Sequence, residues 1–315
     1  MTQHLSMPIE AADRAVANRR KRSAAQRSEM WYAYLFILPM VIGYIAFLLG
    51  PIITSFYMSL TDWSLVKEST FIGLANYRKL MFHDPVFWDT AWNTLYFTIC
   101  LVPLNIMMTL GLALLMQKAI PGISFFRTAI FTPVVTSIVV WAVVWKYILA
   151  TDNGVLNIVL RMFGIEGHAW LYDMKLAIPV IVVVTLLKGL GMNMVIFIAA
   201  LQDVPKMYYE AARIDGSSPW QTFRNVTLPL ISPSIFLVTI ITMIGSLKVF
   251  GQIFVMTDGG PGTSTYVFVY YIYQQAYKIF QFGYASSIAF VLFFIILALT
   301  ILQWFGRKKW VHYED

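Results

Sequence analysis

Two lysines lie inside long apolar runs of this 315-residue chain, and their side chains are the best placed to do chemistry. An ionisable group is costly in a bilayer, and it usually faces a cavity, a transported species or a paired group. Polar neighbours accompany both lysines and complete a set of candidate solute-cavity residues: Lys188, Asn193, Ser246, Lys248 and Gln252. Lys248 and Gln252 are four residues apart, which predicts one shared helix face. The alternative is that Lys248 snorkels toward water and Lys188 bonds helix carbonyls.

The residues that would give the chain a catalytic or ion-coupling role are missing around these lysines. No Asp or Glu lies in a long apolar run, so a secondary transporter driven by protons or sodium is the less favoured alternative. The histidines do not pair at a ligand spacing and there is one cysteine, so no metal site and no disulfide are expected. The chain has no Gly-Lys dipeptide and therefore no Walker A phosphate loop. We expect no catalytic residues, metal or cofactor in this chain.

The elements that must position the lysines are transmembrane helices. The chain is 59% hydrophobic and only 12% charged, whereas soluble domains carry about 25% charged residues. Its apolar runs reach the ~20 residues that a helix needs to cross a bilayer. We predict an all-α integral membrane protein with six transmembrane helices in a domain that covers 31–306. The predicted spans are about 31–61, 90–117, 125–149, 177–202, 233–256 and 284–306.

Lysine and arginine counts orient the predicted spans. If both termini lie on one side of the membrane, that side carries 14 Lys and Arg residues and the other side carries 7. Because cytoplasmic loops carry the excess of basic residues, we expect both termini in the cytoplasm. These are the basic N-terminal segment, 1–30, and the tail, 307–315. The run after residue 30 is too long for a signal peptide, so we expect the first span to be retained. The net charge of +7 comes largely from these flanks, and no nucleic-acid partner is predicted.

A polar segment, 203–232, separates the fourth and fifth predicted spans and must stand in water on the cytoplasmic side. Pro205 can open a short helix that covers Met207–Ile214. Gly216 can end that helix in a left-handed conformation.

The same segment contains a second helix start. Ser218 predicts an N-cap, Pro219 suits the first helical position, and Gln221 can close a capping box. Leu228-Pro229 is expected to end this helix before the fifth span. Two short helices joined by a glycine turn predict a compact docking loop, with an ordinary interfacial connection as the alternative.

One extracytoplasmic loop predicts a tight turn. Asp258–Gly262 reads D-G-G-P-G, and Gly-Gly and Pro-Gly neighbours are typical of unusual backbone dihedral angles.

The polar segment carries a motif that identifies a family by resemblance. The motif consists of Glu210-Ala211-Ala212, then Gly216 after three further residues, then Val226-Thr227-Leu228-Pro229 after nine more. This pattern resembles the cytoplasmic loop motif of ABC importer permeases. Isoleucine is more usual at the position of Val226. Further stretches, spread between Leu38 and Ser287, resemble the carbohydrate-uptake branch of that family, which serves maltose, lactose, trehalose and glycerol-3-phosphate. These stretches are Phe56–Trp63, Phe71–Tyr77, Asn93–Thr98, Phe126–Thr136, Leu201–Gly216 and Thr257–Pro261.

The resemblance implies a type I ABC importer permease fold in a bacterial cytoplasmic (inner) membrane. It implies four partners: a cytoplasmic ABC ATPase dimer that binds ATP and Mg, a second and different permease subunit, an extracytoplasmic solute-binding protein and membrane lipid. By the same resemblance, Glu210 pairs with a basic residue of the ATPase, Ala211 and Ala212 make the close contact, and Gly216 makes the turn. The loop residues that carry the match are Glu210, Ala211, Ala212, Asp215, Gly216, Leu228 and Pro229.

The resemblance also implies that the solute contacts the middle of the spans that flank the docking loop. Lys188 and Lys248 both lie in those spans. The implied solute is a sugar or oligosaccharide. An anionic solute, such as glycerol-3-phosphate or an acidic sugar, is the alternative because two cavity lysines would suit it.

Overall fold

The computed structural model describes residues 28–65, 69–117, 121–309 and 311. The predicted N-terminal segment lies outside the described residues up to residue 27, as do tail residues 310 and 312–315. The chain divides into two compact units, one up to Tyr57 and one from Met58, and each is described by itself.

The first unit is helical from its first described residue. One apolar helix of 32 residues covers Ser28–Ser59 and agrees with the first predicted span. A π turn, η1 (Ile45–Leu49), leads into α2 (Gly50–Ser59), and the Gly50 N–H donates to the Ile45 carbonyl. Proline at position 51 lacks an N–H and crowds the preceding turn, so a wider turn there lets the helix continue.

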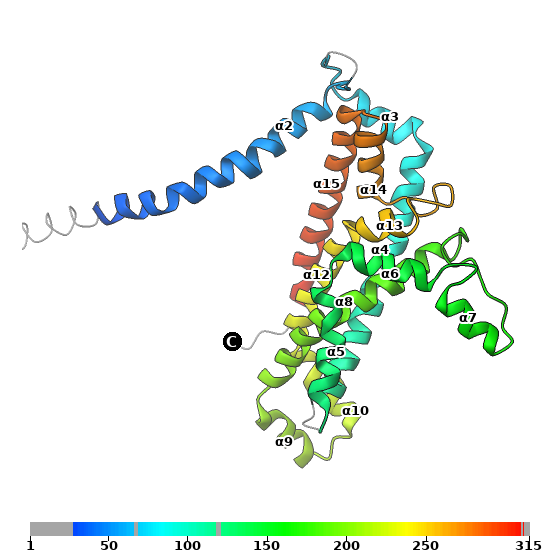
Figure 1. Ribbon diagram of the computed structural model, residues 1–315. Coiled ribbons are helices and arrows are strands. Elements are labelled where there is room, and N and C mark those ends of the chain that lie inside the picture. The colour runs from blue at the N-terminus through cyan, green and yellow to red at the C-terminus, as the bar shows by residue number, and fades with distance from the viewer. Residues whose placement is uncertain (1–27, 66–68, 118–120, 310, 312–315) are drawn as a thin grey trace, which may run out of the picture. The chain divides into compact units, whose positions relative to one another are not determined.

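The second unit is a bundle of long helices joined by short ones (Figure 1). Its elements are α3 (Ala75–His83), α4 (Pro85–Met116), α5 (Ile123–Val135), α6 (Ile138–Ile148), α7 (Val155–Met162), α8 (Ala177–Asp203), α9 (Lys206–Ile214), α10 (Pro219–Thr222), η2 (Phe223–Thr227), α11 (Leu228–Leu230), α12 (Ser232–Leu247), α13 (Gly251–Met256), α14 (Phe268–Tyr273), η3 (Gln274–Lys278), α15 (Phe282–Gly306) and η4 (Arg307–Lys309).

Four helices of the described residues are long and apolar enough to cross a membrane, and the number rises to six if each of two bent pairs counts as one span. Helices α4, α8 and α15 agree with the second, fourth and sixth predicted spans. One bent pair is α5 with α6, at 106°, and the other is α10–α11 with α12, at 67°.

Two predicted spans are not the continuous helices that we expected. The third span breaks at Thr136–Ser137, just after Pro133, a residue that cannot donate a backbone hydrogen bond. The fifth span leaves its helix at Leu247 and resumes at Gly251.

The core of the second unit forms where α4 packs along α8 and α12. Apolar burial contributes little between helices in lipid, so close packing and hydrogen bonds must hold them together. Asn193 on α8 donates to Asn105 Oδ1 at 2.7 Å and to Thr242 Oγ1 at 3.3 Å. Ser246 Oγ on α12 donates to Thr98 Oγ1 at 3.0 Å. These buried bonds fix the three helices against one another.

Asp84 joins the start of α4 to two other helices. Its Oδ1 accepts the Phe87 N–H at 3.2 Å and so caps α4. Its Oδ2 accepts the hydroxyls of Tyr271 on α14 and Tyr284 on α15, each at 2.5 Å. One carboxylate therefore holds the corner between α3 and α4 to the C-terminal helices.

The tight turn predicted at Asp258–Gly262 is present, with positive φ at Asp258 (47°), Gly259 (83°) and Gly262 (59°). A Cβ on Gly259 would lie 2.4 Å from the Tyr270 ring, so this position also requires glycine for space.

Candidate functional site

The docking loop begins with α9, whose end is fixed by glycine chemistry. Pro205 is the N-cap rather than a helical residue, so α9 starts at Lys206. Gly216 has φ of +68°, which confirms the predicted left-handed cap. The Ser217 N–H donates to the Ala212 carbonyl at 2.9 Å and the Gly216 N–H to the Arg213 carbonyl at 3.1 Å. These two hydrogen bonds form the Schellman motif, which satisfies the last carbonyls of the helix.

The second helix of the loop starts as predicted. The Gln221 N–H donates to Ser218 Oγ at 3.3 Å, and the Ser218 N–H donates to Gln221 Oε1 at 2.8 Å. Pro219 occupies the first helical position. The capping box at the start of α10 is therefore complete.

The predicted end of this second helix at Leu228-Pro229 is wrong. The helix continues through the π turn η2 and α11, and the bend into α12 comes at Ile231. The Leu228 N–H donates to the Phe223 carbonyl, so the chain is widened just before Pro229. As at Pro51, a wider turn accommodates the proline ring inside a helix.

The docking loop presents only part of its motif to solvent. Glu210 and Ala211 on α9 are exposed, but Ala212 is buried within this chain, with 8% of its surface accessible. Of the two alanines, only Ala211 is open to a partner. Ile214 is 86% exposed and Trp220 is 67% exposed, so the loop shows large apolar side chains to water. Such exposure is typical of a contact surface.

The other motif residues frame this surface. Asp215 and Gly216 are exposed, and Leu228 and Pro229 are half-buried. Tyr209 on the inner side of α9 shares a hydrogen bond with Thr227 Oγ1 at 3.3 Å, which holds α9 against η2. Helices α9 and α10 lie together at one end of the second unit, and α15 runs toward that end (Figure 1).

Lys188 lies on α8 and binds the bend of the third span. Its Nζ donates to the Pro133 carbonyl at 2.8 Å and to the Thr136 carbonyl at 2.6 Å. Both carbonyls belong to the break between α5 and α6. The structure therefore has the carbonyl-bonding arrangement that the sequence left open as an alternative for Lys188.

Helix α8 holds the bent span at two further points. A Cβ on Gly191 would lie 2.7 Å from the Ile130 carbonyl oxygen, so glycine permits α5 to approach α8 closely. On the far side of the break, Trp141 Nε1 on α6 donates to the Val184 carbonyl at 3.0 Å. Together with Lys188, these contacts fix both arms of the bend to one straight helix.

The other solute-cavity candidates differ in their surroundings. Asn193 and Ser246 are buried in bonds between helices. Lys248 is the C-cap of α12 and is exposed, whereas Gln252 lies in α13 and is buried. The shared helix face predicted for Lys248 and Gln252 is wrong, because the break at 248–250 separates them.

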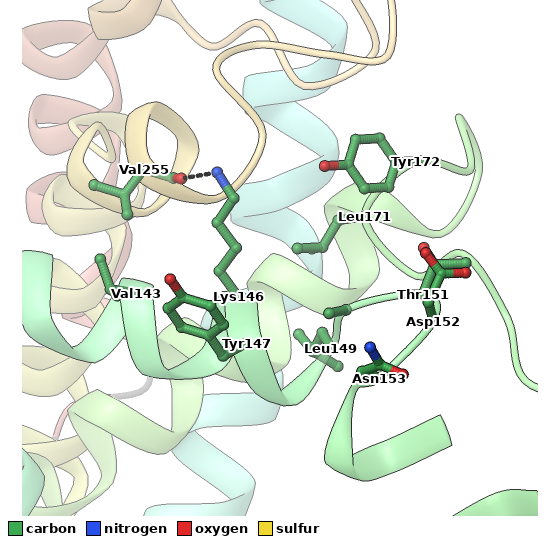
Figure 2. A pocket seen from close by; sticks show the side chains of 11 residues that line it. Val143, Lys146, Tyr147, Leu149, Thr151, Asp152, Asn153, Leu171, Tyr172 and Val255 are labelled. Carbon is green, nitrogen blue, oxygen red and sulfur yellow. Dashed lines mark hydrogen bonds between the residues drawn. The ribbon is translucent and has the colours of Figure 1, made fainter. Parts of the chain in front are cut away.

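A pocket of about 650 Å³ lies at the other end of α6 (Figure 2). The walls come from α6, the loop after it, Leu171–Tyr172 and Val255 on α13. Lys146 reaches across from α6 and donates to the Val255 carbonyl at 2.9 Å. The residues that line it are Val143, Lys146, Tyr147, Leu149, Ala150, Thr151, Asp152, Asn153, Leu171, Tyr172 and Val255.

Asn157 fixes the loop that forms one side of this pocket. It is fully buried, its Nδ2 donates to the carbonyls of Thr151 and His168, each at 2.9 Å, and its Oδ1 accepts Trp170 Nε1 at 2.8 Å. Beyond it, the Lys175 N–H and the His168 ring lower the pKa of Asp173. Sequence reasoning missed Asn157, although the turn formers just before α7 were an available signal.

Comparison with known proteins gives consistent matches along the chain. The family described as binding-protein-dependent transport system inner membrane component matches residues 15–311. The lactose transport system permease protein LacF of Rhizobium radiobacter is 33% identical over 297 residues, covering 91% of this chain and 98% of LacF. The arabinooligosaccharides transport system permease protein AraP of Bacillus subtilis is 31% identical over 295 residues, covering 89% and 92%.

The fold resembles the crystal structure of a bacterial ABC transporter involved in the import of the acidic polysaccharide alginate. The TM-score is 0.81 at 23% identity, over 91% of this chain and 99% of the matched chain. The chain thus agrees in fold and in sequence with proteins that carry out transport rather than catalysis. The chain belongs to the family of binding-protein-dependent transport system inner membrane components, as an ABC importer permease subunit that works with a separate ATPase subunit.

Proposed function

We propose that this permease subunit imports a sugar or oligosaccharide and that it is driven through the docking loop, 203–232. Its six spans, with both termini in the cytoplasm, alternate between inward-facing and outward-facing states. A cytoplasmic ATPase dimer that binds ATP and Mg supplies the energy. An extracytoplasmic binding protein delivers the solute, and a second, different permease subunit completes the pathway.

The observation that carries this proposal is the exposed face of α9. Glu210 stands in solvent next to the small side chain of Ala211, on a helix whose end is fixed at Gly216. An exposed carboxylate can pair with a basic residue of the ATPase, and the alanine permits close approach. Because the loop is capped at both of its helices, little ordering is needed on binding, which favours the transmission of force.

The sugar assignment is supported by the relatives and by the chemistry of the lysines. LacF and AraP carry names of sugar and oligosaccharide transport systems. Lys188 donates two of its three N–H groups to backbone carbonyls, which leaves one N–H for any further acceptor. Of the five solute-cavity candidates, Lys248 alone is exposed, and we assign it the solute contact. With one lysine exposed and the other bound mainly to backbone carbonyls, a neutral solute is favoured over an anionic one.

The test is purification of the tagged chain from its native membrane in mild detergent, with Glu210→Ala compared against Glu166→Ala. Glu166 is an exposed glutamate outside the docking loop and is the matched control. We expect wild type and the control to bring down an ATPase that has a Walker A loop, together with a second permease. Glu210→Ala should lower recovery of the ATPase about tenfold, as expected for truncating one partner of a charge pair. Equal recovery with both variants would refute the role of Glu210.

A further inference from the structure

The pocket at the outer end of α6 has side chains whose polar groups are not used by the fold. In the described part of the chain, no hydrogen bond is formed by the phenol groups of Tyr147 and Tyr172, the carboxylate of Asp152 or the amide of Asn153. Tyr147 and Tyr172 are 73% and 66% exposed, so both rings stand open to an incoming molecule. Figure 2 shows these side chains around the space that Lys146 crosses. Polar groups that line an open pocket and have no internal partners are suited to a ligand.

The chemistry of the lining fits a neutral polyhydroxyl compound. The one cation, Lys146, and the one anion, Asp152, balance each other. Carboxylate and amide oxygens accept hydrogen bonds, and phenol and amide groups donate them, so a hydroxyl that does both finds partners here. The two tyrosine rings, with Val143 and Leu171, add apolar surface for the C–H faces of a sugar ring. The volume of about 650 Å³ lies within the roughly 300–1,000 Å³ usual for small-molecule sites.

The pocket is held in shape before any ligand arrives. The bond from Lys146 to the Val255 carbonyl ties α6 to α13, and Asn157 fixes the loop that carries Thr151. A Cβ on Gly154 would lie 2.2 Å from the Ala150 carbonyl oxygen, so the loop closes tightly behind the pocket. A preformed site avoids the cost of ordering its loops on binding.

Two helices that pack together, α6 and α13, form one wall of the pocket. At the ends away from the pocket, the first residues of the two helices meet, because Ile138 packs against Gly251. A Cβ placed on Gly251 would lie only 3.1 Å from Ile138. That contact is next to the break at 248–250, which holds Lys248. In the orientation proposed above, the pocket is at the extracytoplasmic end of this wall.

We propose that this pocket is an extracytoplasmic subsite that receives a neutral sugar from the binding protein before the sugar reaches Lys248. Tyr147 and Tyr172 contact the ring faces, and Asp152 and Asn153 bind the hydroxyls. The inference rests on the proposed sugar-import function and adds a second, outer contact to it.

The direct test uses the assembled importer in nanodiscs, without binding protein. Asn153→Cys is labelled with a membrane-impermeant maleimide in the presence and absence of lactose, maltose or arabinotriose. Cys100 is first replaced by serine. The matched control is Phe163→Cys, because Phe163 is an exposed aromatic residue of the same outer region that does not line the pocket. We expect a transported sugar to slow labelling at position 153 several-fold and to leave position 163 unchanged.

The second measurement is sugar uptake by proteoliposomes that contain the whole importer and its binding protein. Tyr147→Ala and Tyr172→Ala should each raise KM for the sugar about tenfold. Phe163→Ala should leave both KM and basal ATPase activity unchanged. If wild type imports one of the sugars but the tyrosine variants behave like Phe163→Ala and labelling is not slowed, the subsite is refuted and the sugar function stands. If wild type imports none of the sugars but carries another class of solute, both are refuted.

Discussion

Lys188→Met removes the ammonium group that binds the bend of the third span and keeps an unbranched side chain in its place. The Thr136 carbonyl then loses its hydrogen-bond partner among the described residues, and an unpaired carbonyl costs about 1–3 kcal/mol where it is buried. The Pro133 carbonyl still accepts the Thr136 N–H at 3.2 Å, so its loss is nearer ~1 kcal/mol. Methionine also removes a half-buried charge and recovers part of its desolvation cost. The net destabilisation should be about 1–3 kcal/mol.

The assay compares Lys188→Met with Lys248→Met. Lys248 is exposed at the other break, so the same substitution there should change the free energy of unfolding by less than about 0.5 kcal/mol. Unfolding is followed in mixed micelles by titration with a denaturing detergent. Spin labels at the exposed residues Phe126 and Val144, one on each arm of the bend, report the angle between α5 and α6. We expect a broader distance distribution for Lys188→Met only.

Equal unfolding midpoints and equal label distances for the two methionine variants would show that Lys188 does not hold the bend. In that case the bend would be held by Gly191 and Trp141 without the ammonium. Lys188→Arg separates charge from fit. It keeps the cation but is longer and planar, so it should recover part of the stability and not all of it.

Three further predictions follow from single residues. Gly216→Ala places a side chain at φ of +68° and should destabilise the docking loop by about 1 kcal/mol, which should reduce recovery of the ATPase. Gly164 also has a positive φ but lies outside the docking loop, so Gly164→Ala should leave recovery of the ATPase unchanged. Asn157→Ala removes the bonds to Thr151, His168 and Trp170 and should cost about 2–4 kcal/mol locally, seen as faster amide exchange after α6; equal exchange would contradict its role. Asp84→Asn replaces an acceptor of two tyrosine hydroxyls with a neutral amide and should lower the free energy of unfolding by about 1–3 kcal/mol, measured by the same micelle titration; an unchanged midpoint would contradict the link.

Features set by local chemistry were predictable from the sequence. The cap at Gly216, the capping box from Ser218 to Gln221 and the turn at Asp258–Gly262 all depend on residues that are neighbours in the chain. Their dihedral angles and hydrogen bonds follow from residue type and spacing alone. The same holds for the straight spans, where uninterrupted apolar length was sufficient.

Features that depend on distant partners were not predictable. The break after Pro133 persists because Lys188, about fifty residues later in the chain, supplies donors for its carbonyls. Proline in an apolar run is compatible with either a kinked or a continuous helix, and only the packed neighbour decides. The burial of Ala212 was not predictable for the same reason. Ala212 belongs to the motif, but whether its side chain faces a partner or its own chain depends on how α9 packs on η2.

The two broken spans explain why Lys188 is bound by backbone carbonyls whereas Lys248 is exposed. Non-helical backbone at membrane depth persists only where it is buried in protein or lines a water-filled cavity. The first break is covered by α8, and Lys188 is fixed there by the carbonyls of the break. The second break carries Lys248, which is exposed, and an exposed ammonium within a predicted span is expected to face water or a polar solute. Because Ile138 packs on Gly251, the two breaks are neighbours. We therefore propose Lys248, rather than Lys188, as the residue that contacts the solute.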